Sequence, residues 1–559
     1  MVGQNLSKYP LLAQTLLQNR GIVTPEDAEK FLNPNYERDI YDPFLILNME
    51  KAVERVLRAM DLDEKIVIFG DYDCDGIPGS VTLHDFFKKI GYANFEVYIP
   101  HRHNEGYGLN IEAIEKIAEG GAKLMITVDC GISDVKEVAR AQELGVDVIV
   151  TDHHLAQEIL PTAYTILNSK QIGDKYPDNM LCGAGVAWKL VCALLSRGNE
   201  KWKIQAGWEK WLLDMAGLST IADMVPLKNE NRVLAYYGLA VLRKSRRVGL
   251  RNLLRKMDIM QENIVEDDIG FMIGPRINAA SRMGDPMDAF RLLSTTDEKE
   301  GSKLADHLTH LNDTRKGLVA SMMRDARKHI DLRISSESLR EVIVIGNPEW
   351  KPGLVGLLAS NIVDAYSRTT FVWGRAEDGS IKGSCRSDGT VNLVELMTGA
   401  REGIFLDIGG HSEAGGFSTS ADGVHKLEDE LALVYKKLCY EKKEISQEID
   451  ANLLLSESNL STWKIVERFA PFGVGNPKPV FLFEKICVSQ IRKFGKEKSH
   501  IELGFEDSPV KAICFFAEEP VYETLKSGSV VDLIATMEMN TFRGKRELRL
   551  RIVNVVKKS

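Results

Sequence analysis

The stretch KIVIFGDYDCDG, residues 65–76, decides the fold of the first large part of the chain. Its first half is a continuous apolar run, which is typical of a strand buried on both faces of a parallel sheet. Its second half places Asp71, Asp73 and Asp75 directly after that strand. In extended backbone, side chains two residues apart point the same way, so these carboxylates can converge on one point. Because such like charges repel unless a cation lies among them, the pattern predicts a metal site.

Further apolar runs alternate with helical patterns after this stretch, which predicts a parallel sheet with helices on both faces. The runs are FEVYIP (95–100), AKLMITVDCG (122–131), VDVIVTDHH (146–154) and AYTILN (163–168). Two of them end as the first does, since one delivers Asp129 and another delivers Asp152, His153 and His154. Ligands of open α/β sheets bind at the carboxyl ends of the strands. We therefore expect three strands to bring oxygen and imidazole ligands to one edge of the sheet.

Mixed aspartate and histidine ligation favours Mn²⁺ or Mg²⁺ over a structural zinc ion. A phosphodiesterase with two metal ions needs a bridging carboxylate with further Asp and His ligands, and this edge supplies that set. A calcium loop is the first alternative, but the twelfth position counted from Asp71 is Thr82, where an EF-hand has glutamate. A solvated acidic turn is the second, but it does not explain repetition at three strand ends. The two-metal site is the hypothesis we carry forward.

The rest of the chain is organised into further units. A polar helical pattern without proline covers residues 301–333, and a second α/β pattern begins at EVIVIG (341–346). Strand-rich sequence with glycine turns follows from about residue 450, which predicts a small β-barrel. The expected division is an N-terminal extension (1–50), a catalytic α/β domain (51–300), a connecting helix (301–335), a second α/β domain (336–445) and the barrel (446–559).

Composition sets the class of protein but not its partner. At 559 residues the chain is too long for a single core. Its eight cysteines include no C-x-x-C pair, and no leader or membrane span is evident, so we expect a cytoplasmic protein. The net charge of −9 argues against a nucleic-acid partner. The charge is uneven, however, because residues 540–559 carry seven Lys/Arg against one acid.

The motifs DYDCDG, TVDCG and DHH resemble the successive motifs of the DHH phosphoesterase superfamily, whose members hold two Mn²⁺ or Mg²⁺ ions. The resemblance implies that one ion is held by Asp73 and Asp129, with Asp71 where many relatives have a histidine. It implies that the other ion is held by Asp75, Asp129 and His153, which makes Asp129 the bridging ligand.

Other positions take a role only through this resemblance. Asp223 in TIADMVPL matches the fourth motif and is implied as a further metal ligand, whereas alone it would be an ordinary helix cap. His154 would face the scissile phosphate. In the resulting mechanism, water activated by the ions held at Asp129 attacks the phosphodiester, and His154 with Arg276 stabilises the charge that develops.

Two stretches resemble the RecJ exonucleases within this superfamily in particular. EGYGL (105–109), preceded by Arg102, looks like a substrate gate and implies that Arg102 and Tyr107 bind substrate. GPRINAASRMGDP (274–286) resembles the signature before the connecting helix, and it offers Arg276 and Asn278 to phosphate. The family more often has glycine where Ser281 stands here. Without its neighbours this signature would be a packed turn with incidental arginines.

The second α/β unit carries GSCRS (383–387) and GGHSEAGG (409–416), where small residues let a backbone approach a phosphate. They resemble the DHH-associated domain, DHHA1, and imply substrate contacts from Ser384, Arg386, Gly410 and His411. Alone, these stretches would be simple turns. Relatives often have histidine where Lys351 stands, so this chain keeps a cation at that position but not an imidazole.

The last segment resembles an oligonucleotide-binding (OB) barrel, which the relatives with small substrates lack. Its basic strand offers side chains that could follow a phosphate backbone and stack a base, namely Phe542, Arg543, Lys545, Arg546 and Arg549. The alternative is a hairpin with a solvated basic face.

Together the resemblance implies a metal-dependent exodeoxyribonuclease that degrades single-stranded DNA from 5′ to 3′ in recombination and repair, with a helicase and a single-strand binding protein as candidate partners. Polarity rests on the family alone. Two alternatives stay open. A phosphodiesterase for short RNA or cyclic dinucleotides would end near the GGH motif, about 140 residues earlier. A catalytically dead scaffold would have lost several acids, whereas every expected ligand position is filled.

Overall fold

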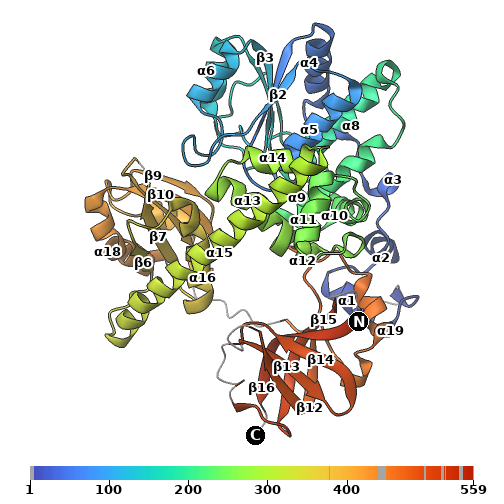
Figure 1. The fold of residues 1–559 in the computed structure, drawn as a ribbon, viewed down its shortest axis with the longest axis vertical. Coiled ribbons are helices and arrows are strands. Elements are labelled where there is room, and N and C mark those ends of the chain that lie inside the picture. Colours follow the sequence, from blue (N-terminus) through green and yellow to red (C-terminus); the bar gives the residue numbers. More distant parts are fainter. Residues whose placement is uncertain are drawn as a thin grey trace.

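The computed structural model describes residues 6–376, 378–438, 448–495, 499–517, 522, 524–540 and 546–557. These residues form two α/β lobes joined by a long helix, together with a β-barrel (Figure 1). The fold class predicted from the sequence is thereby confirmed. Among the helices of the described residues, none combines the length and the apolar character needed to cross a membrane.

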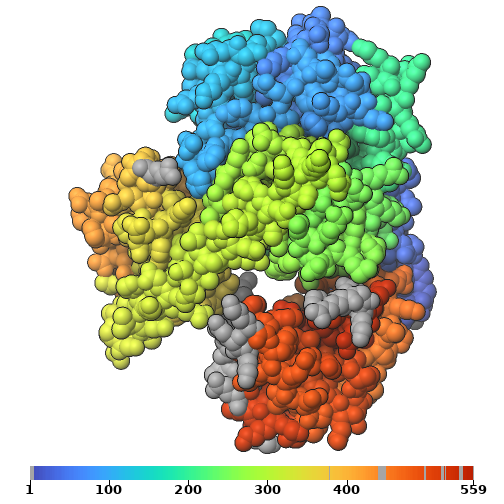
Figure 2. Space-filling model, in the orientation of Figure 1, coloured from blue at the N-terminus to red at the C-terminus, as the bar shows by residue number. Residues whose placement is uncertain are grey.

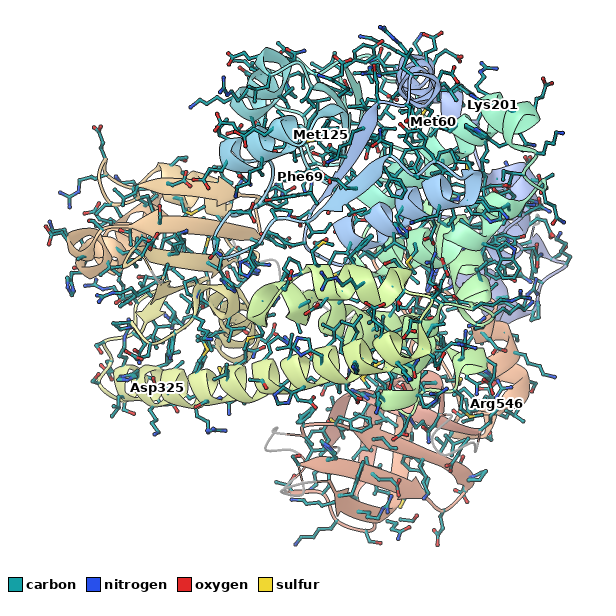
Figure 3. All side chains as sticks on the ribbon, turned by 45° about the horizontal axis from the view of Figure 1, so that its top comes forward. Met60, Phe69, Met125, Lys201, Asp325 and Arg546 are labelled. Carbon is teal, nitrogen blue, oxygen red and sulfur yellow. The ribbon has the colours of Figure 1, made fainter. Side chains whose placement is uncertain are left out.

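The first lobe contains a five-stranded sheet in which every pairing is parallel. In spatial order its strands are β2 (Phe95–Tyr98), β1 (Lys65–Gly70), β3 (Ala122–Val128), β4 (Asp147–Thr151) and β5 (Thr165–Leu167). Its two faces bury different side chains, and Phe69 and Met125, both labelled in Figure 3, belong to the core on one of them. That core includes α6 (Ile111–Glu119) and α7 (Val135–Glu143). The other face packs against α4 (Met49–Asp61), α5 (Gly76–Ile90) and α8 (Gly183–Trp202).

A helical layer follows the sheet and ends in a single long helix, α15 (Glu298–Ser335), that reaches the second lobe (Figure 1). The side chain of Asp297 caps α15 by accepting the backbone N–H of Glu300 at 2.7 Å. The helices of this layer are α9 (Leu213–Ala222), α10 (Asn229–Leu242), α11 (Val248–Lys256), α12 (Glu266–Asp268), α13 (Gly274–Met283) and α14 (Met287–Ser294).

The second lobe has a mixed sheet in the order β6-β7-β8-β10-β9, in which only the β6–β7 pairing is parallel. The strands are β6 (Ile343–Gly346), β7 (Thr370–Arg375), β8 (Ile381–Arg386), β9 (Asp407–Gly410) and β10 (Ala414–Thr419). The helices are α16 (Pro352–Tyr366), α17 (Leu393–Thr398) and α18 (Ala421–Leu438). Helix α16 packs against the end of α15, and their shared core ties this lobe to the connecting helix.

The barrel is closed because β12 pairs with β13 on one side and with β15 on the other. Around the barrel the strand order is β12-β13-β14-β16-β15, and β15 is again next to β12. The strands are β12 (Val480–Phe494), β13 (His500–Phe505), β14 (Ser508–Cys514), β15 (Val530–Asn540) and β16 (Glu547–Lys557), with the short β11 (Ala451–Asn452) beside β12. Helix α19 (Leu460–Glu467) precedes them. Closure satisfies the strand edges that an open sheet would expose.

The N-terminal segment packs on the barrel, a contact that the sequence did not predict. It contains α1 (Leu11–Asn19), α2 (Pro25–Leu32) and α3 (Tyr36–Asp39). Leu16 and Leu17 are fully buried in the same core as Phe481 and Phe483 of the barrel. In Figure 2 the dark blue N-terminal segment lies against the orange and red barrel. The two ends of the chain thus build one unit.

Candidate active site

Three neighbouring strands carry their acidic residues to one edge of the first sheet. The backbone N–H groups of Asp71, Asp129 and Asp152 each donate to a carbonyl at the end of the next strand, at 3.0, 3.0 and 3.1 Å. The parallel ladder therefore continues one residue past β1, β3 and β4 and sets these three aspartates in a row. We call this set of strand ends, with the side chains gathered on it, the acidic edge.

His153 lies at the centre of one group of carboxylates on the acidic edge. Its Nε2 atom is 3.1 Å from Oδ1 of Asp129, and 3.6 Å from Oδ2 of both Asp75 and Asp223. Asp223 enters this group from the end of α9, far along the chain from the strands. Three carboxylates converging on one imidazole nitrogen are a ligand set for a divalent cation.

A second group consists of Asp71, Asp73 and Asp129, whose nearest oxygen atoms lie within 4.8 Å of one another. Oδ1 of Asp71 and Oδ1 of Asp129 are buried and have no hydrogen-bond partner among the described residues. Burying a carboxylate oxygen without a partner costs free energy unless a bound cation interacts with it. The residues present therefore fit two divalent ions, with Asp129 common to both groups.

The loop between β1 and α5 is held in place by its own carboxylates. Asp73 accepts two backbone N–H groups of this loop, at 2.8 and 3.1 Å. Asp75 accepts the N–H groups of Gly183 and Ala184 at the start of α8, at 2.6 and 2.8 Å. A Cβ atom on Gly183 would lie 2.6 Å from Cβ of Asp129, so glycine is required for this approach. Asp129 itself has a φ of 62°, a backbone conformation that is uncommon for a residue other than glycine.

Burial and mutual repulsion of the carboxylates shift the pKa values of this site. Burial first, and then the charge of Asp73, raises the pKa of Asp75 to about 6. Burial, Asp75 and Asp73 raise the pKa of Asp223 to about 9. The pKa values of Asp71 and Asp129 are raised for the same two reasons. Burial lowers the pKa of His153 to about 3, so its imidazole is neutral and can act as a ligand.

His154 is oriented by Asp152, which the sequence placed at this strand end but to which it gave no orienting role. Oδ1 of Asp152 lies 2.8 Å from Nδ1 of His154 and accepts the backbone N–H groups of both histidines. Burial opposes the effect, but the hydrogen bond and charge of Asp152 raise the pKa of His154. The hydroxyl of Tyr107 lies 3.2 Å from the same nitrogen and donates to the carbonyl of Asp129 at 3.1 Å. In the sequence, the signal that points to Asp152 is its place as the first residue of the DHH triplet.

The loop that carries Tyr107 is fixed to the acidic edge by a further carboxylate. Oδ2 of Asp134, the residue directly before α7, accepts the N–H of Leu109 at 2.8 Å. Gly108 has a φ of +80°, and a Cβ atom there would lie 2.8 Å from Oδ2 of Asp134. Only glycine allows this close contact. Tyr107 is therefore held over the site by the short loop that follows Asp129.

A cleft of 1390 Å³ runs between the two α/β lobes, which are blue and orange in Figure 2. Tyr107, His154 and Arg102 line it from the first lobe. The second lobe contributes several cationic or small residues to the opposite wall, namely Lys351, Arg375, Lys382, Gly410 and His411. The cleft thus joins the acidic edge to a wall suited to phosphate.

Four arginines gather between this cleft and α15. They are Arg102, Arg276, Arg282 and Arg315. Burial, with the charges of Arg102 and Arg315, lowers the pKa of Arg282 to about 9. Burial also lowers the pKa of Arg276, whose buried Nε has no partner among the described residues, and neither has Oδ1 of Asn278. Guanidinium groups that repel one another and keep unused donors are suited to bind an anion.

The residues expected to bind substrate are only partly brought together. Gly410 and His411 line the cleft, whereas Ser384 and Arg386 do not. Those two lie on β8 next to Gly356 of α16, where a Cβ atom would be 3.3 Å from Oγ of Ser384. Arg276 and Asn278 lie in the arginine cluster on α13, also outside the lining of the cleft.

The barrel shows an aromatic and cationic surface of which the sequence singled out only Arg549. We call it the aromatic face, formed by Phe494, His500, Phe515, Phe516, Arg549 and Arg551. The guanidinium of Arg551 lies 4.2 Å from the ring centre of Phe515, and Phe516 is 72% exposed. Exposed rings beside arginines can stack bases and attract phosphates. No spacing rule collects these residues, because they come from β12, β13, β16 and the segment directly after β14.

Of the basic strand predicted to bind DNA, Phe542, Arg543 and Lys545 lie outside the described residues. Arg546 is exposed and is labelled in Figure 3. Arg549 pairs with Glu538 and lies 5.6 Å from the ring centre of Phe515, so it belongs to the aromatic face.

Comparison with known proteins identifies the family. Three family models match: "DHH family, N-terminal domain" over residues 65–219, "DHHA1 domain" over 339–438 and "RecJ OB domain" over 449–554. The single-stranded-DNA-specific exonuclease RecJ of Haemophilus influenzae is 32% identical, over 98% of this chain and 96% of its own. The chain belongs to the RecJ family. RecJ of Bacillus subtilis is 36% identical over 98% of this chain and 68% of its own length.

Solved RecJ structures have the same fold. RecJ of Thermus thermophilus in complex with Mn²⁺ has a TM-score of 0.81 at 27% identity, over 98% of this chain and 76% of that one. An exonuclease RecJ bound to manganese has a TM-score of 0.61 at 32% identity, over 70% of this chain and 95% of that one. The RecJ resemblance drawn from the sequence is thereby confirmed.

Proposed function

We propose that this chain is a single-stranded-DNA-specific exonuclease that hydrolyses the terminal phosphodiester from the 5′ end, in recombination and repair. The observation that carries the proposal is the acidic edge, where carboxylates from three segments surround Nε2 of His153 at 3.1–3.6 Å. Relatives that match over nearly the whole chain are named as single-stranded-DNA-specific exonucleases. The 5′ polarity follows the family resemblance.

The residues proposed to hold two divalent ions, Mn²⁺ or Mg²⁺, are Asp71, Asp73, Asp75, Asp129, His153 and Asp223. When bound, these ions supply an activated water and neutralise charge on the phosphate. Asp129 would serve both ions because it belongs to the group with Asp71 and Asp73, and its Oδ1 also lies 3.1 Å from Nε2 of His153 in the other group. Related proteins have been solved with Mn²⁺ and with Mg²⁺.

The protein's own groups orient the phosphate and hold a proton. His154 would donate to a phosphate oxygen, because Asp152 holds its ring and favours the protonated form. The arginine cluster would bind the neighbouring phosphates. Arg276 is the member of this cluster for which the sequence predicts contact with phosphate. Gly410, His411 and Arg102 would hold the end of the strand in the cleft, and we keep Tyr107, Asn278, Ser384 and Arg386 as further proposed contacts.

The barrel would hold the strand outside the cleft, since exposed rings next to arginines bind single strands with little sequence preference. The same barrel argues against the alternative of an enzyme for short RNA or cyclic dinucleotides. The filled ligand positions of the acidic edge argue against a catalytically dead scaffold.

A single-stranded oligonucleotide labelled at its 5′ end or its 3′ end tests activity and polarity together. With Mn²⁺, the 5′ label should appear early as mononucleotide while the 3′-labelled strand shortens step by step. Matched duplex and RNA should survive. Early release of the 3′ label would overturn the polarity, and hydrolysis of dinucleotides with intact DNA would overturn the substrate.

A helicase and a single-strand binding protein are proposed partners, because an exonuclease confined to single strands needs duplex DNA to be opened. We also propose a cytoplasmic location. All seven cysteines in the described part of the chain are free thiols, which suits a reducing compartment.

A further inference from the structure

A second cavity lies away from the acidic edge, where the N-terminal segment, α10 and the barrel meet. Its volume is 460 Å³. Residues between Arg20 and Tyr41 form one side, Lys228 to Val233 form the second, and Gly475 of the barrel closes it. We call it the junction cavity. None of its lining residues belongs to the cleft between the α/β lobes.

The lining of the junction cavity is strongly cationic in a chain whose net charge is −9. It contains five cationic residues, Arg20, Lys30, Arg38, Lys228 and Arg232, against Asp27 and Asp39. Both acids are engaged locally. Asp39 pairs with Arg38, and Asp27 accepts the hydroxyl of Thr24 at 2.7 Å. Arg20 also lies 3.6 Å from Asp450, and Lys30 lies 3.2 Å from Glu26. Among the described residues, the positive charge of the lining that has no ion-pair partner therefore comes from Lys228 and the buried Arg232.

Arg232 is the buried centre of this charge. It is 3% exposed, and its guanidinium donates to the carbonyls of Phe31, Ala470 and Pro471. None of these partners in the described part of the chain is a carboxylate. Burial, and then the nearby charge of Arg20, lowers the pKa of Arg232 to about 9. A buried cation that faces another cation is stabilised by an anion bound next to it.

We infer that the junction cavity binds the phosphate of a small nucleotide, of the nucleoside 5′-monophosphate class that the exonuclease reaction releases. The volume of 460 Å³ far exceeds what a bare phosphate needs, since a water molecule occupies about 30 Å³ in the liquid. The aromatic residues Phe31 and Tyr41 also line the cavity. The guanidinium of Arg232 lies 3.8 Å from the ring centre of Phe31, so Tyr41 is the ring that offers apolar surface for a sugar or base. The choice of nucleotide rests on the proposed function, whereas the anion site rests on the charges alone.

The position of the cavity suggests what an occupant would do. Arg232 contacts the N-terminal segment and the barrel through carbonyls of both. The loop from Asp223 to Lys228 runs from the acidic edge to the cavity, and within it the N–H of Leu227 donates to Val474 of the barrel at 2.7 Å. A bound nucleotide would therefore stabilise the attachment of the barrel and the loop that carries Asp223.

The test is calorimetric titration of the full chain with deoxycytidine 5′-monophosphate in EDTA, where the metal-dependent site is silent. We expect binding at one site, with deoxycytidine and inorganic phosphate binding more weakly. Arg232→Ala would disturb the junction itself, so the exposed pair Lys30→Ala/Lys228→Ala is the informative variant. Removing both cations should weaken binding by about tenfold or more. The exposed pair Lys123→Ala/Lys244→Ala, outside the cavity, is the matched control and should bind as the unchanged chain does.

The inference is overturned if no nucleotide binds without metal ion, or if Lys30→Ala/Lys228→Ala binds normally while Arg276→Ala does not. Equal affinity for inorganic phosphate would overturn the nucleotide class. Asp129→Ala should retain this metal-independent binding while losing exonuclease activity. Since the titration requires no turnover, its failure would leave the exonuclease assay intact, and failure of that assay would leave the anion site intact.

Discussion

The acidic edge and the aromatic face represent two ways of building a site on the same chain. At the acidic edge, Asp71, Asp75 and Asp129 are at most 3% exposed, and each depends on the charges around it. On the aromatic face, Phe516 is 72% exposed and the ring contacts are edge-on, between residues of β12 and β13 and the segment directly after β14. Buried charges are strongly coupled, so losing one disables the set. Exposed stacking contacts are nearly independent, so losing one weakens the surface only in part.

The sharpest contrast is expected from Asp129→Ala. Because Asp129 lies in both groups of ligands, we expect exonuclease turnover to fall by about a thousandfold or more, as when catalytic groups act as a unit. The variant should stay folded, since it removes one of several repelling carboxylates. Turnover with Mn²⁺ and circular dichroism measure the two effects. Asp364→Ala, an exposed carboxylate on α16, is the control, and normal turnover in Asp129→Ala would refute the metal assignment.

A smaller loss is expected when the orientation of His154 is disturbed. His154→Ala should lower kcat by about a hundredfold, the range for a positioned acid or base. Asp152→Asn should lower it less, by about tenfold, because the ring keeps its place but loses the charge that favours its protonated form. KM should change little in either variant. A rise in KM at constant kcat would assign His154 to strand binding instead.

The acidic edge should also make stability depend on pH in the absence of metal. The pKa values of Asp75 and Asp223, raised to about 6 and about 9, mean that the folded chain keeps protons that the unfolded chain has released. Stability contributed by these groups therefore falls as pH rises from about 4 towards 9. Calorimetric melting should show that Mn²⁺ raises Tm more at pH 8 than at pH 6. An equal increase at both values would contradict these shifts.

The mildest effect is expected on the aromatic face. Phe515→Ala/Arg551→Ala should weaken binding of a long single strand by about tenfold, since base stacking contributes about 1–3 kcal/mol per base. Turnover of very short strands should stay unchanged, because they do not reach the barrel. Lys464→Ala on α19 is the control. A loss on short strands as large as on long ones would show that the two sites are not independent.

Much of the acidic edge could be predicted because it depends on local order in the chain. A buried strand followed by an acid sets both the direction of the backbone and the position of the carboxylate. Asp71, Asp129 and His153 therefore lie close together, as their positions at the ends of neighbouring strands predicted. Asp223 was found only through family resemblance, because a helix from another part of the chain brings it there. Asp152 was visible in the DHH triplet, but its hydrogen bond to His154 required coordinates.

The sequence by itself determined the parallel sheet, the connecting helix and the barrel, because apolar periodicity fixes which faces must be buried. Tertiary structure alone decided which distant surfaces meet. It placed the N-terminal segment in the barrel core, gathered the aromatic face from three strands and the segment after β14, and set Arg232 where three parts of the chain converge. The periodic pattern of a segment shows which of its faces is buried, but not which distant surface covers that face, since any apolar surface of the right shape can pack there. The covering surface is decided only when the whole chain packs.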